Sequence, residues 1–313
     1  MKTGLLTKNR KVFIWCLFDW ANSPYPTVIL TFVFSAYFTK LVAEDEISGT
    51  FLWSQTIAFS GLFMAFVAPI LGAISDETGK KKIWILVFSI LAILATLSLW
   101  FVLPDKKSVP LALIAIAISL IAFEFCAIFY NATLIQVANS SSIGKVSGLG
   151  WAAGYIGAII CLLICLFGLV ERNFSFLRLD IDQSEHIRAT TIVVGLWWFI
   201  FSLPFFIFFK EGKGAAHFSS RHILKGLNRL FTTIKNIKHY RPIMLFLLSR
   251  MFYADGLLVV FQFGGIYAAG TFGMTFSEIL KFGIAMNIFA GLGAFVFAWV
   301  EDWLTSKQRS LFR

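Results

Sequence analysis

The sequence predicts an all-α, polytopic membrane protein, because it is too apolar for a soluble domain and its apolar residues come in long runs. Of its 313 residues, 58% are hydrophobic and 14% are charged, and 36 are phenylalanine. Soluble domains hold roughly 45–50% apolar and about 25% charged residues. A helix needs about 20 apolar residues to cross a hydrocarbon core of about 30 Å. The chain therefore has enough apolar sequence for a bundle of membrane-spanning helices.

Eight apolar runs are long enough to be candidate membrane spans. They cover residues 12–41, 51–75, 83–103, 110–137, 148–170, 190–209, 242–270 and 279–300. The first and the seventh exceed the minimum length, so we expect these two helices to tilt or kink in the bilayer.

The basic residues between the runs predict the orientation of the chain. They precede the first run at 2–11, follow the second at 80–82, and fill the connection 210–241 after the sixth, whereas the acidic residues 44–46 lie in an opposite loop. Cytoplasmic loops of membrane proteins carry the excess of lysine and arginine. We therefore expect a cytoplasmic N-terminus in the cytoplasmic (inner) membrane. The net charge of +10 is then a topology signal, and we expect no nucleic-acid partner.

The connection 210–241 divides the chain into two related parts. Its apolar residues recur at helical spacing among basic ones, which favours an amphipathic helix on the inner leaflet over a solvated basic linker. Trp20–Ser23 in the first run is echoed by Tyr253–Gly256 in the seventh. Parallel repeats of this kind enclose a midplane site between two bundles. We predict three parts: a six-helix bundle at 1–209, a basic linker at 210–241, and the first two helices of a second bundle at 242–313.

A polar cluster inside the first run indicates a solute pathway. Asp19, Asn22 and Tyr25 lie there beside Pro24 and Pro26. Lipid offers no hydrogen bonds, so such groups persist at membrane depth when they face protein or a wet cavity. Asp19 could instead be a structural charge paired with another helix. The prolines either kink the helix or offer freed carbonyls to a solute or cation.

Two further runs contain charged residues that extend this prediction. An acid in a gated cavity can bind and release a proton as its exposure alternates, so Glu124, with Asn131 two turns further along, is a candidate for proton coupling. Arg250 and Asp255 could bind the carboxylate and ammonium of an amino acid, or they could neutralise each other or Asp19. We expect six of these side chains to face one common central cavity: Asp19, Asn22, Tyr25, Glu124, Arg250 and Asp255.

Motifs of enzymes and of ATP-driven pumps do not occur in this sequence. His-x-x-Glu-His, Gly-x-Ser-x-Gly and a Walker-type loop are all missing. The four histidines lie in loops without the spacing of metal ligands. We therefore expect no catalysis, no metal site and no cofactor.

The loop after the second run resembles the signature loop of the major facilitator superfamily. Residues 72–81 read Gly-Ala-Ile-Ser-Asp-Glu-Thr-Gly-Lys-Lys, with Glu77 in place of the usual first base. The resemblance implies a twelve-helix facilitator fold. It also implies a conformational latch made of Gly72, Asp76, Gly79, Lys80 and Lys81.

Within that superfamily the chain resembles the vacuole-effluxer family, relatives of the autophagy-related vacuolar amino-acid permease. The resemblance rests on residues 19–25, 147–155, and 253–256 with 264–273. It implies secondary transport of a small solute by alternating access, with amino-acid export as the leading function, protons as a candidate coupling ion and the lipid bilayer as environment.

Members of this family resemble a twelve-helix plan, whereas eight spans are predicted here. We expect about eight of the twelve helices in this chain, which looks truncated at its C-terminal side. A separately encoded C-terminal part is a candidate partner. The alternative function is a non-transporting remnant, truncated or split, of such a transporter.

Overall fold

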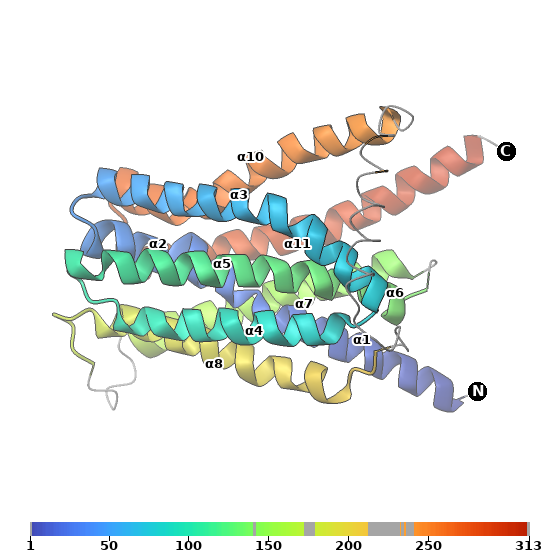
Figure 1. Ribbon diagram of the computed structural model, residues 1–313, viewed down its shortest axis with the longest axis horizontal. Coiled ribbons are helices and arrows are strands. Elements are labelled where there is room, and N and C mark those ends of the chain that lie inside the picture. The colour runs from blue at the N-terminus through green and yellow to red at the C-terminus, as the bar shows by residue number, and fades with distance from the viewer. Residues whose placement is uncertain are drawn as a thin grey trace.

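The computed structural model describes residues 2–139, 142–171, 179–211, 232, 235 and 241–311, and in these residues all regular structure is helical. The helices run nearly parallel to one long axis (Figure 1). The elements are α1 (Lys2–Asn22), η1 (Tyr25–Phe32), α2 (Phe34–Tyr37), η2 (Phe38–Val42), α3 (Glu46–Thr78), α4 (Lys81–Ser98), η3 (Leu99–Phe101), η4 (Lys106–Ser108), α5 (Val109–Asn131), α6 (Leu134–Val137), α7 (Ile143–Ile164), η5 (Cys165–Val170), α8 (Glu185–Phe208), α10 (Arg241–Phe272) and α11 (Phe276–Leu311).

Eight segments of the described chain are long and apolar enough to cross a membrane, which confirms the predicted number of spans. Each overlaps one of the predicted runs, and the differences are shifts at the ends. The segments are Asn9–Val42, Glu46–Gly72, Lys81–Phe101, Lys106–Val137, Ile143–Val170, Glu185–Phe208, Arg241–Phe272 and Phe276–Gly293. The polytopic, all-α membrane fold follows from this arrangement.

The first span departs from a regular α-helix where the prolines predict it. After α1 the chain continues as the π-helical segment η1, which contains Pro26 and follows Pro24. A proline has no N–H to donate to the carbonyl four residues earlier. The Trp20 carbonyl, which Pro24 leaves free, accepts a hydrogen bond from Trp197 Nε1 of α8 at 3.0 Å. The Trp20 carbonyl is therefore used in packing between helices, which favours a structural role of Pro24 over the offer of this carbonyl to a solute or cation.

The first span forms the centre of the bundle. In its most apolar stretch 83% of the residues are buried, compared with 6% in the span that contains α3. Its α1 part packs on α7 and α8, while α4 packs on α5 and α8. Asp19 and Asn22 of α1 therefore lie between helices rather than on the lipid-facing surface.

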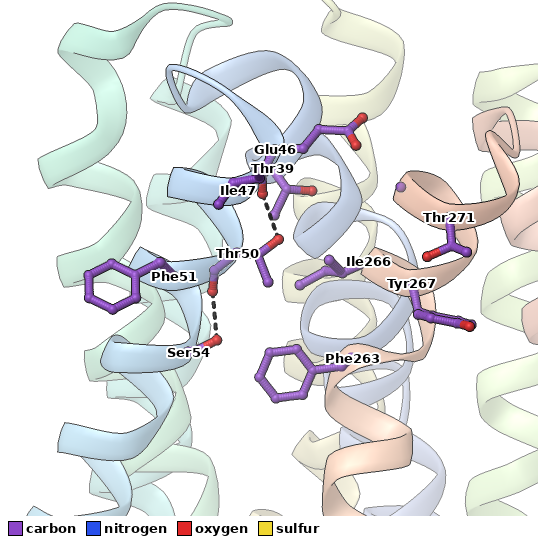
Figure 2. A pocket seen from close by; sticks show the side chains of 11 residues that line it. Thr39, Glu46, Ile47, Thr50, Phe51, Ser54, Phe263, Ile266, Tyr267 and Thr271 are labelled. Carbon is purple, nitrogen blue, oxygen red and sulfur yellow. Dashed lines mark hydrogen bonds between the residues drawn. The ribbon is translucent and has the colours of Figure 1, made fainter.

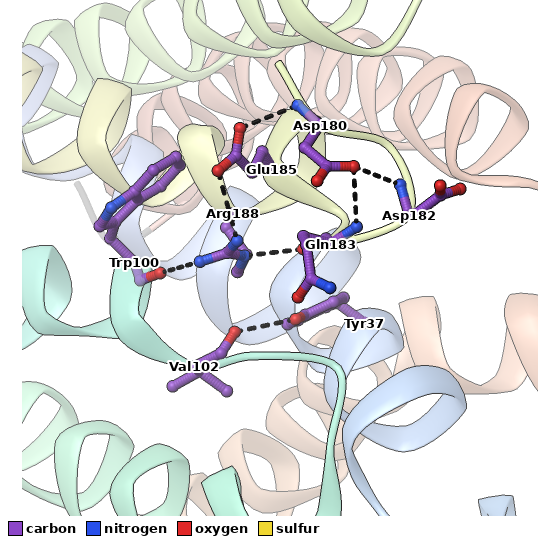
Figure 3. A network of polar contacts seen from close by, with 8 residues as sticks. All are labelled: Tyr37, Trp100, Val102, Asp180, Asp182, Gln183, Glu185 and Arg188. Atoms are coloured by element: carbon purple, nitrogen blue, oxygen red, sulfur yellow. Dashed lines mark hydrogen bonds and ion pairs between the residues drawn. The ribbon is translucent and has the colours of Figure 1, made fainter.

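The start of α3 lies at one end of the bundle, and the turn between α3 and α4 lies at the opposite end (Figure 1). The first end is here called the acidic end, because Glu44, Asp45 and Glu46 precede or begin α3 there and Glu171 directly follows η5. The opposite end is called the basic end, because the turn from α3 into α4 carries Lys80, Lys81 and Lys82. At the acidic end the buried Arg188 of α8 donates to the Trp100 carbonyl at 2.7 Å and to the Gln183 carbonyl at 3.0 Å (Figure 3). Its guanidinium also stacks on the Trp100 ring. This network ties η3 to the start of α8 and fixes the acidic end of the first six spans.

The last two spans meet the first six mainly at the acidic end. The buried residues of α10 all lie near its C-terminal end: Gly265, Ile266, Ala268 and Ala269. The N-terminal half of α10 and the C-terminal part of α11 run away from the other helices toward the basic end (Figure 1). The predicted amphipathic linker 210–241 falls almost wholly outside the described residues, so the three-part division of the chain stays a prediction.

Candidate functional site

Asp19 of α1 lies between α5 and α7. Its Oδ2 atom is 2.9 Å from the Tyr130 hydroxyl of α5, and the same hydroxyl is 2.8 Å from the Trp15 carbonyl. Tyr130 is almost fully buried, at 1% exposed. The hydroxyl has one proton, so it donates either to the Asp19 carboxylate or to the Trp15 carbonyl, and either bond joins α5 to α1.

Aromatic stacking holds Tyr130 in this position. Its ring lies 4.6 Å from the Trp15 ring at an interplanar angle of 12°. Trp15 Nε1 donates to Thr133 Oγ1 at 3.1 Å, and that hydroxyl donates to the Tyr130 carbonyl at 2.7 Å. Packing against Trp15 thus holds Tyr130 in place, and this fixes the position of its hydroxyl relative to the Asp19 carboxylate.

Glycines of α7 allow the close approach that encloses Asp19. A Cβ atom on Gly150 would collide with Asp19 Oδ2, and one on Gly154 would collide with Ser23 Oγ. A Cβ on Gly157 would lie 2.6 Å from the Trp20 carbonyl oxygen. The Gly-x-x-x-Gly spacing is therefore a packing motif, as small residues at such interfaces generally are.

No cation of the described residues pairs with Asp19. The ion pairs in this part of the chain join Lys106 to Glu44, Arg188 to Glu185 and Lys281 to Glu171. A carboxylate at membrane depth with a neutral donor alone can accept a proton or the ammonium group of a solute.

Asn22 and Tyr25 lie further along the same span. Asn22 is 6% exposed, and its side chain has no hydrogen-bond partner among the described residues. Tyr25 is fully buried, and its hydroxyl lies 2.7 Å from Ser119 Oγ of α5. Its ring packs 5.1 Å from that of Phe123. Tyr25 therefore has a hydrogen-bond partner within the bundle, whereas the Asn22 side chain does not.

The structure does not bring every predicted site residue to Asp19. Glu124 is half-buried on α5, one residue beyond the Tyr25 contact at Phe123, and has no hydrogen-bond or ion-pair partner among the described residues. Asn131 is exposed at the end of α5. Arg250 and Asp255 are exposed on the part of α10 that leaves the bundle. Their roles stay predictions, as does the common cavity.

The predicted latch lies at the basic end. Gly79 has a positive φ of 65°, which turns the chain between α3 and α4. Lys81 is buried, and its Nζ donates to the Ala132 carbonyl at 3.2 Å, whereas Lys80 is exposed. The Asp76 side chain is outside the described part of the structure.

Glu211, which sequence reasoning did not single out, accepts from the backbone N–H groups of Lys81 and Lys82. Lys82 Nζ in turn donates to the Phe209 carbonyl at 2.7 Å. These bonds tie the start of α4 to the end of α8. The described contacts of this loop therefore stay within the first six spans.

A cavity of about 510 Å³ lies between α3 and α10 at the acidic end (Figure 2). Its polar lining consists of Glu46 and the hydroxyl residues Thr39, Thr50, Ser54, Tyr267 and Thr271. The Thr50 and Ser54 hydroxyls bond to carbonyls of their own helix. None of the predicted solute-binding residues lines this cavity, so it is separate from the Asp19 site.

The comparisons with known proteins agree with this architecture. The family model described as "Vacuole effluxer Atg22 like" matches residues 46–312. The uncharacterized MFS-type transporter YxiO of Bacillus subtilis is 27% identical, over 94% of this chain and 68% of its own length. Autophagy-related protein 22-1 of Aspergillus fumigatus is 24% identical, over 53% of this chain and 28% of its own length.

No solved structure gives a significant match. The family model covers most of the chain, including the signature loop, α7 with its glycines, and both α10 and α11. This chain therefore belongs to the vacuole effluxer Atg22-like family of transporters.

Proposed function

We propose that this protein carries out secondary transport of a small solute by alternating access, and that the solute is an amino acid. The transporter assignment comes from the family. The substrate class rests on the resemblance to the vacuolar amino-acid permease and on the chemistry of the Asp19 site.

The observation that carries the proposal is an acidic side chain at membrane depth that has no cation of its own. Asp19 has the Tyr130 hydroxyl as its hydrogen-bond donor. An unpaired charge between helices is costly, and intramembrane acids of this kind mark solute and ion pathways. An amino-acid ammonium supplies the missing positive charge, and the nearby Asn22 amide offers both a donor and an acceptor to the same solute.

Glu124 is the proposed proton carrier of the cycle. It is half-buried on α5 without a partner among the described residues, and the neighbouring Phe123 packs against Tyr25 of the first span. A shift of the first span would therefore change the surroundings of Glu124 together with those of Asp19. Export is the proposed direction, on the family resemblance alone.

The second candidate is the non-transporting remnant. The exposure of Arg250 and Asp255 on α10 favours it, because charged side chains at membrane depth otherwise face protein or water. A remnant that keeps the Asp19 site can bind a solute and yet cannot move it.

Tryptophan fluorescence separates these candidates from a protein without a solute site, because Trp15 and Trp20 flank Asp19. The purified chain should show a saturable fluorescence change with one or more amino acids, and Asp19→Asn should weaken that binding at least tenfold. Asp182→Asn, an exposed acid at the acidic end, is the matched control. Binding with flux supports transport, and binding without flux supports the remnant. An unchanged titration in Asp19→Asn would refute the role of Asp19.

A further inference from the structure

The polar side-chain contacts between the last two spans and the first six gather at the acidic end. Glu171, directly after η5, accepts from Lys281 Nζ at 2.7 Å and from Ser277 Oγ at 2.9 Å, both on α11. Lys40 Nζ of η2 donates to the Met274 carbonyl at 3.2 Å, in the turn between α10 and α11. Within the described residues, the acidic end is therefore closed by direct contacts.

An apolar contact lies next to these polar ones on α11. Phe32, the last residue of η1, packs edge-on against Phe282 of α11 at 5.8 Å. A Cβ on Gly283 would lie 2.9 Å from the Phe32 ring, and a Cβ on Gly265 of α10 would collide with the Thr31 carbonyl. The first span therefore packs closely between α10 and α11 at this level. The close packing is possible because Gly265 and Gly283 have no Cβ atom.

The position of Phe32 on a π-helical segment bears on its ability to move. π-Helical segments are rare and are frequently found at functional sites. The prolines upstream remove donors from the same stretch. The segment that carries Phe32 can therefore shift at lower cost than a regular helix.

The ion pair next to the Phe32–Phe282 contact is suited to repeated opening. The Lys281 side chain is 57% exposed and that of Glu171 is 28% exposed. Ion pairs in such surroundings are weak, because water screens them. The Arg188 guanidinium, by contrast, is buried in a network inside the first six spans. The acidic end thus contains two kinds of interaction. The buried Arg188 network joins parts of the first six spans, and the more exposed Glu171–Lys281 ion pair joins the first six spans to α11.

The geometry points to a gate at the acidic end, in which Glu171, Ser277 and Lys281 form a clasp over the Phe32 plug. The gate is closed in this structure, and it opens when α11 moves away from Glu171. This inference rests on the proposed alternating-access function, since it names the residues that hold one of its two states. The Asp19 site lies deeper in the bundle and is not part of the clasp.

A distance measurement tests the gate without any need for transport. Spin labels on Leu103→Cys and Thr271→Cys, both exposed at the acidic end, report its width, and the four native cysteines are buried. Glu171→Gln and Lys281→Gln should each at least double the long-distance population. Lys107→Gln, at the same end and without a side-chain partner among the described residues, is the control and should leave the distribution unchanged.

The charge-swapped double variant Glu171→Lys/Lys281→Glu should restore the short distance if the ion pair acts as described, which excludes a simple folding defect. Single variants that match Lys107→Gln would overturn the gate. A widened distribution in a protein that moves no solute would leave the gate standing and contradict the transport proposal. Solute flux by the protein, together with an unchanged distance distribution in Glu171→Gln and Lys281→Gln, would support the transport proposal and overturn the gate.

Discussion

Gly157→Ala tests the close packing of α7 on α1 that encloses the Asp19 site. The added Cβ would lie 2.6 Å from the Trp20 carbonyl oxygen and 3.2 Å from its Cα, and both are backbone atoms that cannot rotate away. Bringing the first contact to 3.0 Å requires a displacement of about 0.4 Å, from the difference between 3.0 and 2.6 Å. The same oxygen accepts the Trp197 hydrogen bond, so the displacement strains that bond as well.

Overpacking of this kind costs about 1–3 kcal/mol. Alanine in place of glycine inside a helix contributes about 0.5–1 kcal/mol in the opposite direction. We expect a net loss in the free energy of unfolding of about 0–2.5 kcal/mol, by the difference of these ranges. Titration of the purified protein with a denaturing detergent, followed by circular dichroism, measures it.

Gly148→Ala on the same helix is the control, because no atom lies within 4 Å of its added Cβ. It should be neutral or stabilising. The packing argument is refuted if Gly157→Ala and Gly148→Ala give the same unfolding midpoint.

Three further predictions concern the two ends of the bundle. Arg188→Met should lower the free energy of unfolding by about 1–3 kcal/mol in the same titration, because the Trp100 and Gln183 carbonyls lose their donor; a loss within error would contradict the buried network. The Lys281 ammonium and the Ser277 hydroxyl hold the pKa of Glu171 below its ordinary value, so the clasp should be intact at neutral pH and weaken in acid, as the pH falls through that lowered pKa. The spin-label distance should widen there, and an identical pH profile in Lys281→Gln would count against the ion pair. Gly79→Ala should cost about 1–2 kcal/mol in that titration because φ is 65°, whereas Gly72→Ala, with open space around its Cβ, should not; equal effects would contradict a strained turn.

Much of the fold could be predicted from the sequence because the membrane imposes it. Eight apolar runs gave eight spans, since hydrocarbon thickness fixes the length of each helix. Pro24 and Pro26 indicated where the first span departs from regularity. The start of the sixth span was placed too late, at residue 190, because Glu185 and Arg188 resemble loop residues until their buried partners are known.

The partners within the candidate site were harder to predict. Tyr130 is one aromatic residue among many, and nothing in its local sequence shows that it donates to Asp19, 111 residues away. That contact depends on how α1 and α5 are rotated about their axes relative to each other. A helix that is apolar on all sides does not show in its sequence which face meets which neighbour. The same limit applies to Glu211 and to the Glu171–Lys281 pair, whose partners are set by packing between distant spans.

Solute flux in vesicles that contain the purified chain tests the central claim most directly. The account predicts saturable amino-acid flux that responds to a proton gradient, that falls to the level of empty vesicles in Asp19→Asn, and that persists in Asp182→Asn. Flux that is the same in Asp19→Asn and in the unaltered chain, or no flux above empty vesicles from a chain that binds the solute, would contradict the claim that this protein moves an amino acid through the Asp19 site.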